Sequence, residues 1–276
     1  MKIAVLMTCF NRAHTTLCCL QHLFDCEVPK GHKYDVWLVD DASPDGTGEK
    51  IKKTYPSVNV IQGSGKLYWC GGMRLAWTTA SKAKEYDGYI WLNDDTFLHH
   101  SALTTMISDY NEFRIAAKNE VIVAGCVTDL TETITAYGGH NFEDQLVTAD
   151  GRQQPLRMIH GNCVYISKQV FQLVGNFPDY FTHAFGDFDY SLRAAKLGIP
   201  SYLSSVNVGR CGTNPISIWR ISKTPLLERV KDLYSPKNSP CVLFRFCLAH
   251  NGFLYAVKVF IQQHIKVFFP RIKNSE

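Results

Sequence analysis

The sequence has no apolar run long enough to cross a bilayer, no block of like charges and no Cys-x-x-Cys pair. A spanning helix needs about 20 predominantly apolar residues, so the sequence argues against a transmembrane helix. The net charge is only +4, and no basic run occurs in the first 200 residues. Because nucleic-acid-binding chains cluster their cations, no nucleic-acid partner is expected.

The ten cysteines lack the spacings of zinc and redox motifs. Several lie in apolar runs, where a thiol acts as a small hydrophobic side chain. The segment before Thr8 has one lysine and too short an apolar run for a signal peptide. These absences predict a reducing, cytoplasmic compartment.

Strand-like and helix-like segments alternate in the first 100 residues. This alternation predicts an α/β fold, with a mostly parallel sheet covered by helices on both faces. Ligands of such sheets bind beyond the carboxyl ends of the strands. The expected strands are 3–7, 34–39, 58–61 and 88–92, and the expected helices are 13–24, about 47–54 and 71–84.

The second half is less regular. We expect strands at 121–124, 158–166 and 201–208, helices at 167–174 and 187–197, and a loop or hairpin at 138–157. The composition changes near residue 237, which predicts a sheet domain over 1–236 and a helical appendage over 237–276.

The appendage is rich in aromatic and aliphatic residues, and its lysines and arginines outnumber its acids five to one over 241–276. Asn251 and Gly252 interrupt it, while Lys258, Gln262 and Lys266 recur every four residues. This pattern predicts a pair of amphipathic helices. They either pack on the domain or form a homodimer contact, or else they lie on an anionic membrane through residues 241–270.

Asp94 and Asp95 follow the expected strand 88–92. Two adjacent carboxylates at the end of a buried strand repel one another without a counter-charge. Mg²⁺ and Mn²⁺ prefer such oxygen ligands and often share them with substrate phosphates. The pair therefore predicts a divalent-cation site, with capping of a helix near 98–101 as the alternative.

Asp40 and Asp41 end the second expected strand. A carboxylate at this place can accept hydrogen bonds from a ribose hydroxyl or a base N–H. The alternative is that both belong to the turn chemistry of residues 41–46.

Four motifs in order resemble glycosyltransferase family 2, over roughly residues 1–210. They are TCFNR at 8–12, VDDASPDGT at 39–47, LNDDT at 92–96 and GDFDYSLR at 186–193. The resemblance implies a GT-A fold with a nucleotide-binding half over 1–100 and an acceptor-binding half over 101–236. It also implies transfer of a sugar with inversion at the anomeric carbon.

The resemblance assigns roles by position. Asp95, with Asp94, would hold Mn²⁺ or Mg²⁺ on the diphosphate. Asp187 would be the catalytic base, and the start of a helix at this residue would favour its ionised form; a cap role is the alternative. Asp189 and Arg193 would support the base, and the residues near the nucleotide would be Thr8, Asn11, Arg12, Asp40 and Asp41.

The chain departs from the family pattern at three places. Gly186 stands where an acid usually precedes the base, and residues 208–214 contain no histidine, so no third metal ligand is identified. Arg210 is an alternative counter-charge for the diphosphate. Arg74 would contact phosphate or acceptor, or else form a surface ion pair.

Trp69, His160 and Asn162 are donor or acceptor candidates. Trp69 offers an apolar face for a sugar, and Gly161 leaves room for one between His160 and Asn162. His160 is expected to be structural or to face the acceptor.

The expected reaction is transfer from a UDP-sugar, or a dTDP-sugar, to a saccharide or lipid-linked acceptor in surface polysaccharide synthesis. The expected location is cytoplasmic, extending to the inner face of the plasma membrane. Two rivals remain, a nucleotidyltransferase and an inactive GT-A-fold binding or assembly subunit.

Overall fold

The structure is a computed structural model, and it describes residues 1–213, 217, 221 and 223–269. Four parallel strands form its first half: β1 (Lys2–Cys9), β2 (Lys33–Asp40), β3 (Asn59–Gln62) and β4 (Gly88–Leu92). The helices between them are α1 (Ala13–Phe24), α2 (Thr47–Thr54) and α3 (Tyr68–Ala83). The predicted parallel half is confirmed.

The second half extends the same sheet in mixed directions, in the order β3-β2-β1-β4-β11-β6-β12-β5. β11 is antiparallel to both β4 and β6, whereas β12 is parallel to β6. The elements are β5 (Thr96–Leu98), α4 (Ala102–Ala117), β6 (Ile122–Thr128), β7 (Thr135–Tyr137), β8 (Gly139–His140), β9 (Gln154–Leu156), β10 (Met158–Ile159), β11 (Cys163–Ser167), α5 (Lys168–Val174), α6 (Gly186–Lys196) and β12 (Ser201–Cys211).

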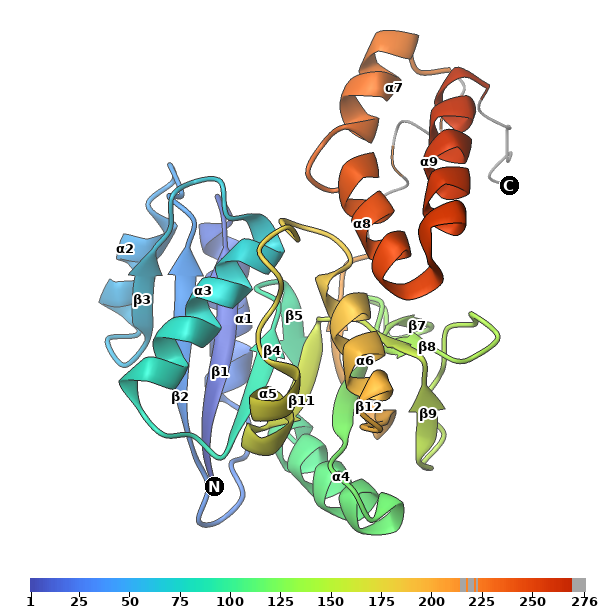
Figure 1. The fold of residues 1–276 in the computed structure, drawn as a ribbon. Coiled ribbons are helices and arrows are strands. Elements are labelled where there is room, and N and C mark those ends of the chain that lie inside the picture. Colours follow the sequence, from blue (N-terminus) through green and yellow to red (C-terminus); the bar gives the residue numbers. More distant parts are fainter. Residues whose placement is uncertain (214–216, 218–220, 222, 270–276) are drawn as a thin grey trace.

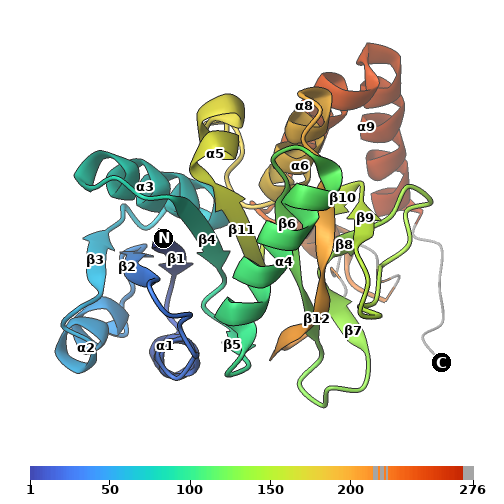
Figure 2. The ribbon, with the colours of Figure 1, turned by 90° about the horizontal axis from the view of Figure 1, so that it is seen from below.

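Helices cover both faces of this sheet. Successive strand residues point to opposite faces, so Val5 and Met7 pack in one core and Ala4 and Leu6 in the other. The first core includes side chains of α1, α2 and α4, and the second includes those of α3, α5 and α6. Figures 1 and 2 show α1 and α2 on one side of the strands and α3 on the other.

The expected strand 158–166 is two strands. β10 pairs with β8 in a small sheet of its own, while β11 crosses into the main sheet beside β4. Between β10 and β11, residues His160, Gly161 and Asn162 belong to neither strand. The backbone N–H of His160 bonds the Gly138 carbonyl, whereas the Asn162 carbonyl accepts from Asn93, and this split directs the two halves to different partners.

Three further helices follow β12: α7 (Leu226–Leu233), α8 (Pro240–Asn251) and α9 (Phe253–Phe268). Gly252, with φ of 88°, separates α8 from α9, at the interruption expected from the sequence. α8 packs on the sheet domain, because its Val242 and Phe246 share a cluster with Cys70 and Phe181. Figure 1 shows α8 next to α6, with α7 and α9 farther from the sheet.

None of the helices in the described ranges is both long and apolar enough to cross a membrane.

Candidate active site

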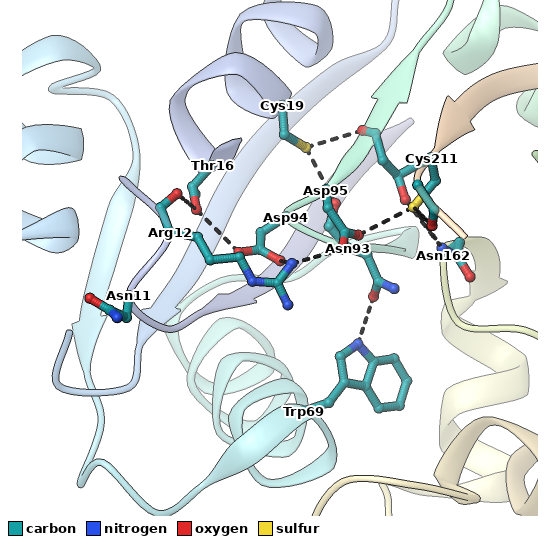
Figure 3. A network of polar contacts seen from close by, with 12 residues as sticks. Asn11, Arg12, Thr16, Cys19, Trp69, Asn93, Asp94, Asp95, Asn162 and Cys211 are labelled. Carbon is teal, nitrogen blue, oxygen red and sulfur yellow. Dashed lines mark hydrogen bonds and ion pairs between the residues drawn. The ribbon is translucent and has the colours of Figure 1, made fainter. Parts of the chain in front are cut away.

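Asp94 and Asp95 lie between the ends of β4 and β5, and Arg12 joins them (Figure 3). The Arg12 guanidinium lies 2.7 Å from Asp95 Oδ2 and 3.3 Å from Asp94 Oδ1. The Arg12 side chain is 48% exposed and that of Asp95 is 34% exposed, whereas Asp94 is 8% exposed. An arginine of the chain therefore supplies counter-charge to this acid pair.

Burial has the largest effect on the pKa of Asp94. The loss of hydration raises the pKa of its carboxyl to about 6, against the opposing effect of Arg12. The Thr16 hydroxyl on α1 donates to its Oδ2 at 3.1 Å. A strand and the residue Ser101 intervene before α4, and Ser101 occupies the N-cap position. Neither acid of the pair therefore caps that helix.

Cys211 at the end of β12 contacts the same acid pair. Its Sγ donates to Asp95 Oδ1 at 3.5 Å, and Asn162 Nδ2 donates to that sulfur at 3.7 Å (Figure 3). Asn162 is buried, so its amide ties β11 to β12. The neighbouring Arg210 points to the other face of the strand, where it pairs with Glu132 at 3.2 Å.

Trp69 connects the acid pair to the region of Asp187. Its indole Nε1 donates to Asn93 Oδ1 at 2.6 Å (Figure 3). Its ring also lies over Gly161, where an added Cβ would come within 2.4 Å of the indole. The room that Gly161 leaves is thus filled by Trp69.

Asp187 is the second residue of α6 and lies beside Gly161. Its Oδ2 accepts the Gly161 N–H at 2.9 Å, and its Oδ1 accepts the N–H of Phe188 at 2.9 Å. These bonds favour the ionised form, as expected for a helix start. Burial outweighs them and raises the pKa of Asp187 to about 6. A carboxyl poised near neutral pH suits a general base.

Asp189 is buried two residues later and binds an arginine and a histidine side chain. Arg193 Nε lies 2.7 Å from its Oδ2, and His250 Nε2 lies 2.8 Å from its Oδ1. Arg193 also donates to the carbonyls of Val174 and Asn176. The predicted supporting pair is in contact, and a residue of α8 joins it.

Asp40, the last residue of β2, and Asp41, which follows it, accept hydrogen bonds from the backbone of two neighbouring loops. Asp40 accepts from the N–H groups of Ser43 and Gly48, which fixes the turn into α2. Asp41 accepts from the N–H groups of the loop before α3, at Gly65 (2.7 Å), Leu67 (2.8 Å) and Tyr68 (3.1 Å). A carboxylate offers about four lone-pair sites, so Asp41 retains little capacity for a base N–H.

The remaining nucleotide candidates are dispersed. Thr8 is buried where Gly72 of α3 passes over it, and the Asn11 N–H donates to Ser43 Oγ. Arg74 donates to the carbonyls of Pro178 (2.9 Å) and Phe181 (3.3 Å). It therefore fixes the segment that precedes α6, and its proposed contact with phosphate stays a prediction.

His160, one of the donor or acceptor candidates, is neutral above acidic pH. Burial, with His140 nearby, lowers the pKa of its imidazole to about 4. Its Nδ1 accepts the Gly138 N–H at 3.1 Å, so Nε2 carries the proton of the neutral ring. Phe188, the residue after Asp187, packs against it.

The acid pair fits a divalent cation in one respect. Asp95 presents a partly exposed carboxylate whose contacts are Arg12 and Cys211, and Asp94 adds a second oxygen donor. Over the described ranges, no group of three histidine, cysteine or acidic side chains is placed to hold a metal. Sites for Mg²⁺ are often built from one or two carboxylates together with substrate phosphates.

Sequence reasoning missed Cys211 and His250. The alternation along β12 could have indicated Cys211, since a strand that reaches residue 211 places it on the face opposite Arg210. No local signal points to His250, because its partner Asp189 lies 61 residues away in the sequence.

A family model described as Glycosyl transferase family 2 matches residues 4–174. A search of curated protein sequences finds no match.

Solved structures of similar fold cover nearly the whole chain. The mannosyltransferase PcManGT from Pyrobaculum calidifontis, solved with GDP-Man and Mn²⁺, has 15% identity and a TM-score of 0.56, covering 97% of this chain and 81% of its own. Residues 1–349 of S. aureus TarS, solved with UDP-GlcNAc, have 13% identity and a TM-score of 0.58, with coverages of 97% and 90%. A longer S. aureus TarS structure has 15% identity and a TM-score of 0.57, with coverages of 95% and 49%. At these identities the likeness shows the fold alone, which is that of GT-A glycosyltransferases.

Proposed function

The chain belongs to glycosyl transferase family 2 and is a glycosyltransferase, and we propose that it transfers a sugar from a nucleotide-sugar to an acceptor hydroxyl with inversion. One observation supports this proposal above the others. Contacts run from Arg12 and Asp95 through Cys211, Asn162 and the neighbouring Gly161 to Asp187. The predicted diphosphate end and the predicted base thus belong to one network.

Asp187 is the proposed base. Its carboxylate removes the proton of the acceptor hydroxyl while the acceptor oxygen bonds to the anomeric carbon and the nucleoside diphosphate departs. A single displacement of this kind inverts the anomeric centre. Asp189 and Arg193 position the helix that carries the base, since Arg193 also bonds the loop before α6.

Asp95 and Asp94 are the proposed ligands of Mn²⁺ or Mg²⁺, and such a cation would neutralise charge on the departing diphosphate. Arg12 is positioned to contact the diphosphate, because it already lies on both carboxylates. Thr8, Asn11, Asp40 and Asp41 would shape the nucleotide pocket through the loops they hold.

The proposed donor is a UDP-sugar, with a dTDP-sugar as the alternative. The similar structures contain GDP-Man with Mn²⁺ and UDP-GlcNAc, which supports a nucleotide-sugar in general. The preference for uracil rests on the motif resemblance.

The proposed acceptor is a saccharide or a lipid-linked saccharide in surface polysaccharide synthesis. His160 is the acceptor candidate of choice, because it packs on Phe188 and has an Nε2 proton to donate. A lipid-linked acceptor would place the enzyme peripherally on the inner face of the plasma membrane.

Release of nucleoside diphosphate from a panel of nucleotide-sugars, with Mn²⁺ and an acceptor, tests the proposal. We expect Asp187→Asn to lower kcat by about 10²- to 10⁴-fold with donor binding retained. Asp95→Ala should weaken Mn²⁺-dependent donor binding. Unchanged turnover in Asp187→Asn would contradict the base assignment, and no turnover by the wild type with any donor would favour an inactive binding subunit.

A further inference from the structure

The outer face of α9 is apolar and exposed. Leu254, Ile261, Ile265 and Phe268 recur at helical spacing, and their exposed fractions are 83%, 51%, 53% and 54%. Residues spaced by three, four and seven fall on one side of a helix. A surface helix ordinarily presents polar side chains there, so the stripe, here called the α9 stripe, calls for an explanation.

The helical bundle does not use the α9 stripe for its own packing. The opposite side of α9 carries the buried Ala256 and Val267. Phe260 packs against Phe244 of α8, and His264 is hydrogen-bonded to Tyr234 beyond α7 at 2.7 Å. α9 therefore has an inner face that holds the bundle together and an outer apolar face that remains exposed.

The charged side chains of α8 and α9 have one sign. No aspartate or glutamate occurs between Lys237 and Phe269. Two exposed cations lie on α9, with Lys258 on the face of the stripe, between Leu254 and Ile261, and Lys266 beside it. A second copy of this chain is a poor occupant, because a twofold contact through the same face brings these cations together without acids on α8 or α9 to pair with them. An anionic surface supplies the missing charge.

We propose that the α9 stripe docks on an anionic lipid bilayer, with the apolar side chains at the boundary of headgroups and acyl chains and the two lysines on the headgroups. Helices that combine an apolar face with lysines lie in this way in membrane interfaces, and a lysine on the apolar face extends its charged end to the headgroups. The position of α8 gives the contact a use. Through His250, α8 contacts Asp189 of α6, the helix that carries Asp187. Docking would therefore bring a lipid-linked acceptor, which rests on the proposed function, to the side of the proposed base.

Co-sedimentation of the full chain with vesicles tests the proposal. We expect binding to vesicles of phosphatidylcholine mixed with phosphatidylglycerol and much weaker binding to phosphatidylcholine alone. The triple variant Leu254→Ser, Ile261→Ser, Ile265→Ser should lose binding. Replacing both Lys258 and Lys266 with glutamine should weaken it by about 25-fold, since each juxtamembrane lysine contributes about fivefold.

Matched controls separate the stripe from general hydrophobicity and charge. The triple variant Ile115→Ser, Ile134→Ser, Leu173→Ser removes equally exposed apolar side chains elsewhere, and Lys52→Gln with Lys53→Gln removes two exposed cations from α2. Both should bind vesicles like the wild type, and circular dichroism should show every variant folded.

Three outcomes overturn the proposal: no binding by the wild type, equal binding by the stripe variant, or a concentration-dependent dimer that the stripe variant abolishes while vesicle binding is absent. Donor hydrolysis without vesicles separates this test from that of the proposed function. The stripe variant should retain hydrolysis, whereas Asp187→Asn should lose it and still sediment with vesicles.

Discussion

His250 of α8 lies 2.8 Å from the carboxylate of Asp189 on α6, and the two side chains are 5% and 1% exposed. The imidazole packs against the ring of Phe246, and its other nitrogen, Nδ1, has no hydrogen-bond partner in the described part of the chain. Asp189 is two residues from the proposed base. The helical appendage therefore contacts Asp189, the side chain proposed to support the base.

We predict that His250→Ala lowers kcat with little change in the donor KM, because the support of Asp187 changes while the nucleotide loops stay in place. A loss of about tenfold corresponds to about 1.4 kcal/mol. Breaking a buried hydrogen bond to a charged group should also lower the free energy of unfolding by about 1.5–3 kcal/mol. Steady-state kinetics and urea unfolding measure the two effects.

His264→Ala is the matched control for His250→Ala. It removes a histidine that bonds Tyr234 within the bundle, so it should lower stability without lowering kcat. His250→Gln keeps a donor for Asp189 and should restore kcat. An equal loss of kcat in both alanine variants would show that His250 acts only through the stability of the bundle.

The pH dependence of kcat/KM follows from the raised pKa of Asp187. The base is active when ionised, so the rate should fall about tenfold per pH unit below about pH 6 and be level above it. Asp94 also has a pKa raised to about 6, so the profiles are compared at saturating Mn²⁺, which would hold the proposed metal ligands ionised. Under that condition the residual activity of Asp187→Asn should show no such limb. A limb near pH 4 would contradict the burial of this carboxyl.

The raised pKa of Asp187 also affects the free energy of unfolding, which should decrease with rising pH while the activity increases. A carboxyl with a higher pKa in the folded state stabilises the fold when protonated, and this contribution is lost as pH rises through about 6.

Arg12→Gln should have opposite effects on two ligands. Without nucleotide, Mn²⁺ should bind more tightly by up to about fivefold, because a half-exposed ion pair worth up to about 1 kcal/mol no longer competes. Binding of the nucleotide-sugar should weaken, because the diphosphate loses a cation. Isothermal titration and Mn²⁺ electron paramagnetic resonance measure these changes without turnover.

Arg74→Gln is the control for Arg12→Gln, since Arg74 bonds carbonyl groups away from the acid pair. It should leave Mn²⁺ binding unchanged. Weaker Mn²⁺ binding in Arg12→Gln would show that Arg12 organises the acids for the metal and does not compete with it.

Gly161→Ala should disturb the packing of Trp69 on Gly161 and, with it, the hydrogen bond from the Gly161 N–H to Asp187. The new Cβ would lie 2.4 Å from the indole, and the adjustment should cost about 1–3 kcal/mol of stability together with activity. Combining it with Trp69→Leu should recover part of the stability. Gly212→Ala meets nothing within 4 Å and serves as the harmless control in thermal unfolding.

The sequence was sufficient for the parallel half of the fold because that half repeats one pattern. The helix expected at 13–24 is α1, and the strand expected at 88–92 is β4. β5 was not predicted, because a strand of three residues is too short to show a periodic pattern. The expected strand 158–166 was too long because an apolar run does not reveal that its two ends pair with different partners.

The sequence was enough to select the acidic residues of the candidate site but not to predict which side chains they contact. The motif order singled out Asp95 and Asp187, which the structure connects through Cys211, Asn162 and Gly161. Their roles as metal ligand and base stay predictions. The partnership of Arg12 with the acid pair depends on how α1 sits against β4, and spacing along the chain does not contain that information. The loop-holding role of Asp41 likewise needs the path of residues 63–68.

The packing of α8 limits how the enzyme can be shortened. A fragment that stops near residue 236 would expose Cys70, the neighbour of Trp69, and Phe181 to water. It would also leave the carboxylate of Asp189 without its histidine. Such a fragment retains the four motifs yet lacks the helix that packs beside the proposed base, so experiments on the isolated sheet domain would describe a protein with part of its core exposed.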